Sequence, residues 1–150
     1  MTSVRPTAAE PVRFRCRTVT ADGRTVARVR EEFGRWLRRC TDLGETRLCD
    51  VILAVNEALA NAAEFAYPNS HPGIIELEGV VDDAGLIVSV ADHGSWRFTH
   101  PTQQRRCRGR GIPLMRALAD SVAIDTRISG TSVELLFSDV RAVRSVDTAT

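Results

Sequence analysis

The sequence predicts a two-layer α/β sandwich in which helices cover one face of a mixed, mostly antiparallel sheet. Two observations lead to this fold class. Apolar residues recur at helical spacing in two long segments, 23–40 and 46–66. Short apolar runs then come in pairs joined by tight turns, a pattern typical of hairpins and of antiparallel pairing. With 150 residues and 43% hydrophobic content, the chain can form one domain with a substantial core.

The first expected elements are a strand and a helix. Apolar and basic residues alternate over residues 12–18, as in a half-buried strand. An amphipathic helix follows over residues 23–40, where apolar residues recur every three or four positions and arginines fill the other face. Within that helix, Phe33 and Trp36 are expected to pack in the core, and the alternative is a platform for a ligand.

The second helix should end near Ala66, because Pro68 disfavours helical geometry in the residue before it. The later elements are two hairpins with one helix between them. Their expected ranges are strands 73–81 and 86–91, helix 112–119, and strands 122–127 and 131–137. Residues 1–11 and 141–150 show little apolar pattern, so the domain is expected to cover residues 12–140 between two flexible tails.

Composition excludes several classes of function. All 20 basic residues are arginine, so the chain can supply neither a P-loop lysine nor a Schiff-base lysine. The net charge of +1 argues against a dedicated nucleic-acid binder. The four cysteines have no zinc-ligand spacing, no signal peptide precedes them, and no apolar run is long enough to cross a bilayer. We therefore expect reduced thiols in a cytoplasmic protein without a membrane partner.

Glu57 and Asn61 lie four residues apart on the second predicted helix, so both side chains can approach one point. A carboxylate there could accept a proton from a hydroxyl, and an amide oxygen could bind Mg²⁺. The alternative is a solvated helix face. The small residues Ala54 and Ala58 favour a binding role, because they are expected to leave room beside the pair.

Asp92 directly follows the apolar strand 86–91 and precedes His93 and Gly94. A carboxylate held at a strand end can accept a hydrogen bond from an exocyclic amine, while a glycine lets a base come close to the backbone. The alternative is an ordinary Asx turn. Thr131, at the start of the last strand, could place its hydroxyl near Asp92 or could simply be a β-branched strand residue.

The segment Gly109–Gly111 precedes the third predicted helix. Free backbone amides at a helix N-terminus, approached closely because glycine has no side chain, favour a phosphate. Arginines surround these glycines, and they could either pair with phosphate oxygens or solvate a loop.

These motifs resemble those of the GHKL ATPase superfamily, and in particular its anti-sigma-factor serine/threonine-protein kinase branch (RsbW-like and SpoIIAB-like). Leu53–Tyr67 is similar to the N-box, Val90–Trp96 to the G1 box and Arg108–Asp120 to the G2 box. The resemblance covers residues 12–137, with the three boxes in the family's order. It implies the Bergerat, histidine-kinase-like ATPase fold, which agrees with the element order above.

The resemblance also implies roles for individual residues. Glu57 would be the base that activates the acceptor hydroxyl, and Asn61 would hold the Mg²⁺ of Mg²⁺-ATP. Asp92 would bind the adenine amine, Gly94 would border the base, and Thr131 would support the adenine through Asp92.

The G2 box would bind the phosphates. Gly109 and Gly111 would receive them on the backbone, and the neighbouring Arg108, Arg110 and Ile112 would complete this part of the ATP site.

The function implied by the resemblance is that of an ATP-binding anti-sigma factor. It would phosphorylate a serine or threonine of an anti-anti-sigma protein of the STAS fold, and it would bind a sigma factor and thereby regulate transcription. A homodimer is possible.

Two alternatives stay open. One is a nucleotide-binding or degenerate interaction module that sequesters a sigma factor or STAS protein without phosphotransfer. The other is a histidine-kinase catalytic domain, which would follow a dimerising helical hairpin that this sequence does not show. Direct binding of nucleic acid through the arginines near residue 108 is the least favoured hypothesis.

Overall fold

The structure, a computed structural model, describes residues 10–66, 73–94 and 111–143. Within these ranges, five strands form one sheet in the order β1-β2-β3-β5-β4, and every neighbouring pair is antiparallel. The strands are β1 (Val12–Arg17), β2 (Ile75–Asp82), β3 (Gly85–Asp92), β4 (Ser121–Arg127) and β5 (Gly130–Phe137). The helices are α1 (Gly23–Cys40), α2 (Glu45–Asn61) and the π-helix η1 (Ala62–Ala66), and residues 111–118 are also helical.

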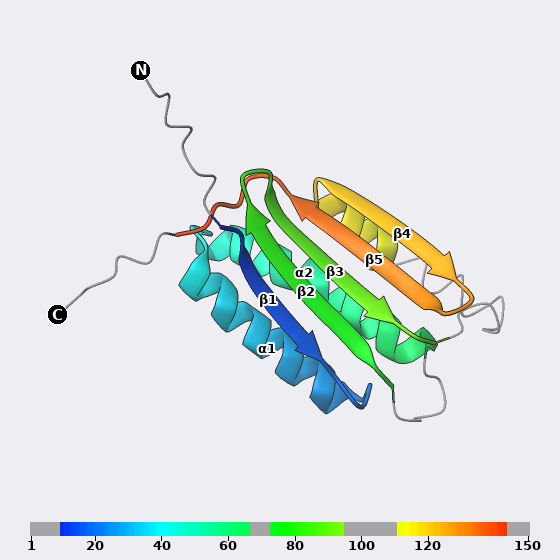
Figure 1. The fold of residues 1–150 in the computed structure, drawn as a ribbon. Helices are drawn as coiled ribbons and strands as arrows, with labels where there is room; N and C mark the ends of the chain where they lie inside the picture. Colours follow the sequence, from blue (N-terminus) through cyan, green and yellow to red (C-terminus); the bar gives the residue numbers. More distant parts are fainter. Residues whose placement is uncertain (1–9, 67–72, 95–110, 144–150) are drawn as a thin grey trace, which may run out of the picture.

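The helices lie on one face of the sheet, as Figure 1 shows, so the predicted two-layer sandwich is confirmed. The sheet differs from the expectation in one respect, because all pairing among the described strands is antiparallel rather than mixed. The predicted helix 46–66 is divided into α2 and the π-helix η1 that continues it.

Helix α1 begins where Asp22 caps it, since the Asp22 carboxylate accepts a hydrogen bond 2.8 Å long from the backbone N–H of Thr25. The same hydrogen bond lowers the pKa of Asp22. Phe33 and Trp36 on its inner face are buried and stack with ring centroids 5.6 Å apart, and Phe14 of β1 packs on both rings. They therefore belong to the core and do not form a ligand platform.

The core lies between the sheet and the helices. In β2 and β3, alternate residues face the helices and are buried, as period-two patterning requires. Strand β4 is different, because most of its residues are exposed and Ile124, which pairs with the buried Val133, is itself 37% exposed. The helical layer therefore covers the sheet from β1 to β5 more completely than it covers β4.

Arg47, near the start of α2, joins three parts of the fold. Its guanidinium hydrogen-bonds both carboxylate oxygens of Asp139, at 3.0 and 3.2 Å, and the carbonyl oxygen of Leu118 at 2.8 Å. It also lies over the ring of Phe137, 5.4 Å from the centroid. Arg47 thus links α2 to the end of β5 and to the end of the 111–118 helix.

The last described residues fold back against the connection between α1 and α2. Asp42 donates its backbone N–H to the carbonyl of Arg141 at 2.9 Å, and its carboxylate accepts the Arg141 N–H at 2.9 Å. Val143 donates its N–H to the carbonyl of Cys40 at 2.9 Å. These bonds lie beyond residue 140, where the sequence predicts the domain to end.

The cysteines in the described ranges, Cys16, Cys40 and Cys49, are free thiols. Among the described residues, no helix combines the length and apolar character that a membrane span requires.

Candidate functional site

The residues that the sequence singles out for a nucleotide come from different elements that meet at one end of the domain. Figure 1 shows the C-terminal end of α2, the C-terminal end of β3 and the start of β5 at this end. Asn61 ends α2, Asp92 ends β3, and Thr131 is the second residue of β5. Gly111 is the first described residue of the helix over residues 111–118.

Asp92 is held firmly at the end of β3. Its side chain is only 5% exposed, and its Oδ1 atom accepts backbone N–H bonds from Gly94 at 3.1 Å and from Thr131 at 3.2 Å. The bond from Gly94 is the Asx-type contact that the sequence left as an alternative. The bond from Thr131 adds the adjacent strand, so this carboxylate is fixed from two directions.

Gly130 allows β5 to approach Asp92 this closely. Its φ of +144° lies in a region that favours glycine, and a Cβ on Gly130 would overlap the backbone carbonyl oxygen of Asp92. In the sequence, Gly130 lies in the connection between the last two predicted strands, 122–127 and 131–137. Its position directly before Thr131 is the signal that ties it to the site.

The hydroxyl of Thr131 is buried without a hydrogen-bond partner in the part of the chain that the structure describes. The residue is 3% exposed, and its backbone N–H is already bound to Asp92. A buried hydroxyl that bonds to nothing costs free energy, so such a group indicates a place for a ligand or a bound water.

Asn61 and Gly111 are in direct contact. Asn61 is 7% exposed, and a Cβ on Gly111 would stand 2.7 Å from its Nδ2 atom and 3.2 Å from its Oδ1 atom. Only a residue without a side chain lets the start of the 111–118 helix come this close. The amide of the N-box segment and the backbone of the G2-box segment therefore lie side by side.

Glu57 lies one helical turn before Asn61 on α2 and is half-buried. Its carboxylate makes no hydrogen bond or ion pair with any residue in the described ranges. Ala54 and Ala58 were expected to leave room beside Glu57 and Asn61, and this expectation is wrong. Both alanines are buried in the hydrophobic core, because their side of α2 faces the sheet.

Three of the predicted phosphate-binding residues, Arg108, Gly109 and Arg110, lie outside the described residues. Ile112 is described, and it is half-buried and packs against the core. Gly94 follows Asp92 at the strand end, where its N–H is bound to the carboxylate.

One further contact at this end of the sheet could not be foreseen. The Nε2 atom of His93 lies 3.7 Å from a carboxylate oxygen of Glu76. Glu76 is on β2, where it pairs with Ala91 of β3, and His93 directly follows the last residue of β3. No signal in the sequence fixes that register.

The residues present fit a nucleotide better than they fit a metal ion alone. A fixed carboxylate at Asp92 and a hydroxyl at Thr131 without a partner among the described residues can bind a base. The contact of Asn61 with Gly111 brings an amide oxygen that can ligate a metal ion close to the first described residue of the 111–118 helix. Within the described ranges, no three acidic, histidine or cysteine side chains gather as metal ligands. A Mg²⁺ ion at Asn61 would therefore draw most of its oxygen ligands from phosphates and water.

Comparisons with known proteins agree with a nucleotide-binding site. A family model described as "Histidine kinase-like ATPase domain" matches residues 19–137. Among solved structures, the chain is similar to "The crystal structure of the RsbU and RsbW domains of Rv1364c from Mycobacterium tuberculosis", with a TM-score of 0.64 and 22% sequence identity. The match covers 89% of this chain and 33% of that chain, and at this identity it shows the fold alone. No curated protein matches the chain at a significant level.

Proposed function

The chain belongs to the histidine kinase-like ATPase domain family, and from this premise we propose that it is an ATP-binding anti-sigma factor with protein serine/threonine kinase activity. Its substrate would be a serine or threonine of a STAS-type anti-anti-sigma protein. The observation that carries the proposal is the convergence of Asn61, Asp92, Gly111 and Thr131 at one end of the sandwich.

The adenine would lie against the end of β3. Asp92 accepts the hydrogen bond of the exocyclic amine, and its orientation is already fixed by the N–H groups of Gly94 and Thr131. The free hydroxyl of Thr131 is placed to bind the base or a water beside it. Gly94 borders the base without a side chain in the way.

The phosphates would lie between α2 and the start of the 111–118 helix. In this proposal Gly109 and Gly111 donate backbone N–H groups to the phosphates. The remaining residues around the phosphates are Arg108, Arg110 and Ile112. Asn61, which touches Gly111, donates an amide oxygen to Mg²⁺.

Bound ATP supplies the phosphoryl group that is transferred. Glu57 lies one turn from Asn61, and it would accept the proton of the acceptor hydroxyl while that oxygen bonds to the γ-phosphorus and ADP leaves with the bridging oxygen. Asn61 and the backbone at Gly111 hold the reacting groups in position. Most of the acceleration of phosphoryl transfer then comes from positioning the hydroxyl and the phosphate and from neutralising the charge on the phosphate.

The RsbU and RsbW domains of Rv1364c share this fold, and the motifs of this chain resemble those of RsbW-like proteins, which supports a role in sigma-factor regulation. A sigma factor and a STAS protein are therefore the proposed partners, the cytoplasm is the proposed location, and a homodimer is possible.

The first test is nucleotide binding by calorimetry, with ATP and ADP, each with and without Mg²⁺. We expect the wild type to bind both nucleotides and Asp92→Asn to bind at least about tenfold more weakly, because the asparagine NH₂ group donates a hydrogen bond where a carboxylate oxygen would accept that of the adenine amine. Lack of binding by the folded wild type would refute an ATP-dependent function.

The second test is phosphotransfer with ATP, Mg²⁺ and candidate STAS proteins. Glu57→Ala should abolish phosphoserine or phosphothreonine formation while ATP and partner binding persist. If a STAS protein binds and is never phosphorylated by the wild type, the kinase activity is refuted.

One observation favours a second candidate function, a binding module without phosphotransfer. Within the described ranges nothing holds the Glu57 carboxylate in place, whereas Asp92 is fixed by two hydrogen bonds. The second candidate predicts that Glu57→Ala changes no measured property, and the same two assays therefore separate the two functions.

A further inference from the structure

Helix α1 carries arginines that nothing in the described structure neutralises. Six of its residues are arginine and two are glutamate, which gives the helix a net charge of +4 (6 − 2). Arg38 alone among the six forms an ion pair with a described residue, an exposed contact of 3.7 Å with Glu45. The other five are Arg24, Arg28, Arg30, Arg35 and Arg39.

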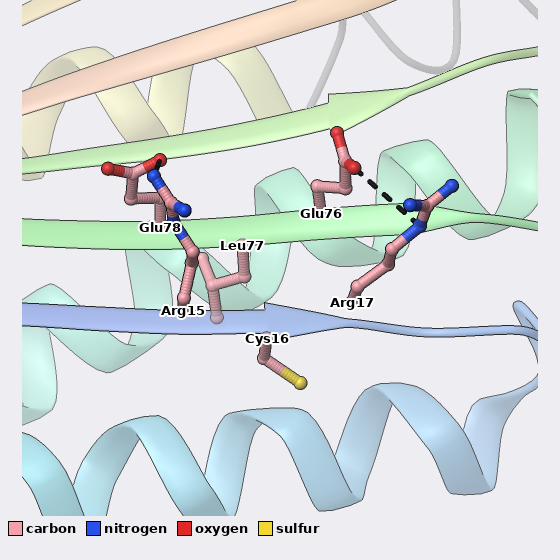
Figure 2. A pocket seen from close by; sticks show the side chains of 6 residues that line it. All are labelled: Arg15, Cys16, Arg17, Glu76, Leu77 and Glu78. Carbon is pink, nitrogen blue, oxygen red and sulfur yellow. Dashed lines mark ion pairs between the residues drawn. The ribbon is translucent and has the colours of Figure 1, made fainter.

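The neighbouring strand β1 shows the opposite arrangement. Figure 2 shows Arg15 and Arg17 beside Glu78 and Glu76 of β2, with ion-pair distances of 3.7 Å in both cases. Arg13 also reaches Glu78, at 3.4 Å. Arg15, Arg17, Glu76 and Glu78 border a hollow of about 560 Å³. The fold therefore pairs the arginines of β1 with carboxylates, whereas among the described residues only Arg38 of α1 has a carboxylate partner.

A second hollow, of about 310 Å³, lies between α1 and α2. Its lining is Arg30, Glu31, Gly34, Arg35, Arg38 and Ile52. Gly34 brings the two helices close, since a Cβ there would stand 3.3 Å from the Cδ1 atom of Ile52. The hollow is thus a groove with an apolar floor and three arginines at its edges.

Two features of this groove favour the binding of a partner protein. Arg30 is held in place, because its Nη1 atom donates a 2.8 Å hydrogen bond to Asn56 on α2. The outer side of α2 also exposes apolar side chains, with Cys49 exposed and Leu53 42% exposed beside the half-buried Ile52. A fixed cation next to exposed apolar surface favours a partner that offers both carboxylates and apolar side chains.

Two of the three arginines of the groove lie away from the candidate nucleotide site, while the third, Arg30, bonds to Asn56, next to Glu57. The start of α1 lies near the site, because Thr18 just before it bonds to Ile75, the residue that pairs with Asp92. The end of α1 lies near Val143, beyond the opposite end of β5. Arg35 and Arg38 are in that second half of the helix.

We propose that the groove between α1 and α2 binds an acidic, amphipathic segment of a partner protein. Its carboxylates pair with Arg30, Arg35 and Arg38, and an apolar side chain rests on Ile52. The binding does not depend on the nucleotide site, so it stands or falls separately from the proposed kinase activity. A nucleic acid is a poorer occupant, because its phosphate backbone offers nothing to the apolar floor of the groove at Ile52. A flat lipid surface is poorer too, since the apolar floor lies between two helices.

The test uses a fluorescein-labelled helical peptide of about 20 residues, with leucines along one stripe and glutamates on both sides of it. Anisotropy should report saturable binding to the wild type that weakens as salt rises, because screening shortens the range of the arginine charges. The double variant Arg35→Glu, Arg38→Glu should weaken binding by about tenfold or more.

The matched control is Arg28→Glu, Arg39→Glu, which makes the same change in charge on the same helix outside the groove. We expect it to change the affinity by no more than about threefold. Circular dichroism establishes that both double variants are folded. Equal losses of peptide affinity in the two double variants would show that binding depends on the overall charge of α1. That result would overturn the proposed binding site in the groove.

Two more measurements complete the test. Asp92→Asn should bind the peptide as the wild type does, whatever its affinity for ATP. A single-stranded DNA or a phosphatidylserine vesicle that binds through Arg35 and Arg38 while the peptide does not would overturn the proposal. Failure of the peptide to bind the folded wild type would overturn it as well.

Discussion

Gly111 touches the side chain of Asn61, and this contact joins the start of the 111–118 helix to the end of α2. Gly111→Ala should displace the Asn61 amide, because the new Cβ would stand 2.7 Å from Nδ2. We expect the affinity for Mg²⁺-ATP, measured by calorimetry, to fall about tenfold. Gly44→Ala is the control, since a Cβ at Gly44 meets nothing within 4 Å. Unchanged affinity in Gly111→Ala would remove Asn61 from the proposed site.

Gly130→Ala tests the approach of β5 to Asp92. The substitution combines a positive φ with overlap on the Asp92 carbonyl oxygen, so we expect a loss of at least about 2 kcal/mol in the free energy of unfolding. Urea denaturation measures it.

The matched control for this glycine is Gly85→Ala, at the opposite end of the same sheet. Gly85 also has a positive φ, of 123°, and a Cβ there would overlap the carbonyl oxygen of Phe137. We expect a comparable loss of stability in both variants but weaker ATP binding only in Gly130→Ala. Equal effects on ATP binding would show that both act through stability alone.

Thr131→Val separates ligand binding from stability. The valine keeps the β-branched shape and removes a hydroxyl that has no partner in the described structure. We expect the melting temperature to stay the same or rise, because an unsatisfied buried hydroxyl costs about 1–3 kcal/mol. ATP affinity should fall, and Thr131→Ser should retain most of it. A marked loss of stability in Thr131→Val would show that the hydroxyl already bonds within the protein.

Asp139→Asn tests the link between Arg47 and the end of β5. The hydrogen bonds from Arg47 lower the pKa of Asp139 below its ordinary value of 3.8. The carboxylate therefore contributes stability above pH 3.8, and this contribution disappears as the pH falls through the lowered pKa. The difference in unfolding free energy between wild type and variant should be largest at neutral pH and should fall toward zero in acid.

The size of that difference is expected to be no more than about 1 kcal/mol, because the Asp139 side chain is 53% exposed. Asp83→Asn, in the exposed turn between β2 and β3, is the control for the removal of one surface carboxylate. A difference that grows in acid would contradict the assignment.

Periodicity predicts most of the fold because the core is a single apolar layer. The alternation in β2 and β3 and the helical spacing in α1 follow directly from which residues are buried, and their predicted bounds are within a few residues of those observed. The sequence does not predict contacts that depend on register between strands, such as His93 with Glu76. It also misplaces Ala54 and Ala58, since residue size alone cannot show which side of a helix faces the sheet.

The candidate site is predictable to a similar extent. Asp92 is recognisable as a strand-end acid, but its second hydrogen bond comes from Thr131, 39 positions later in the chain. That contact requires β3 and β5 to be neighbours although β4 precedes β5 in the sequence. The role of Gly130 depends on the same pairing, which hairpin signals alone do not specify.

The bonds that Arg141 and Val143 make to Asp42 and Cys40 bear on how this protein should be produced for experiments. A fragment ending at residue 140 would lose the acceptor for the Asp42 N–H and would loosen the connection from which α2 starts. An expression boundary placed after Val143 keeps that corner intact. Tags and fluorophores attached beyond this point would then report on the native arrangement rather than on a frayed one.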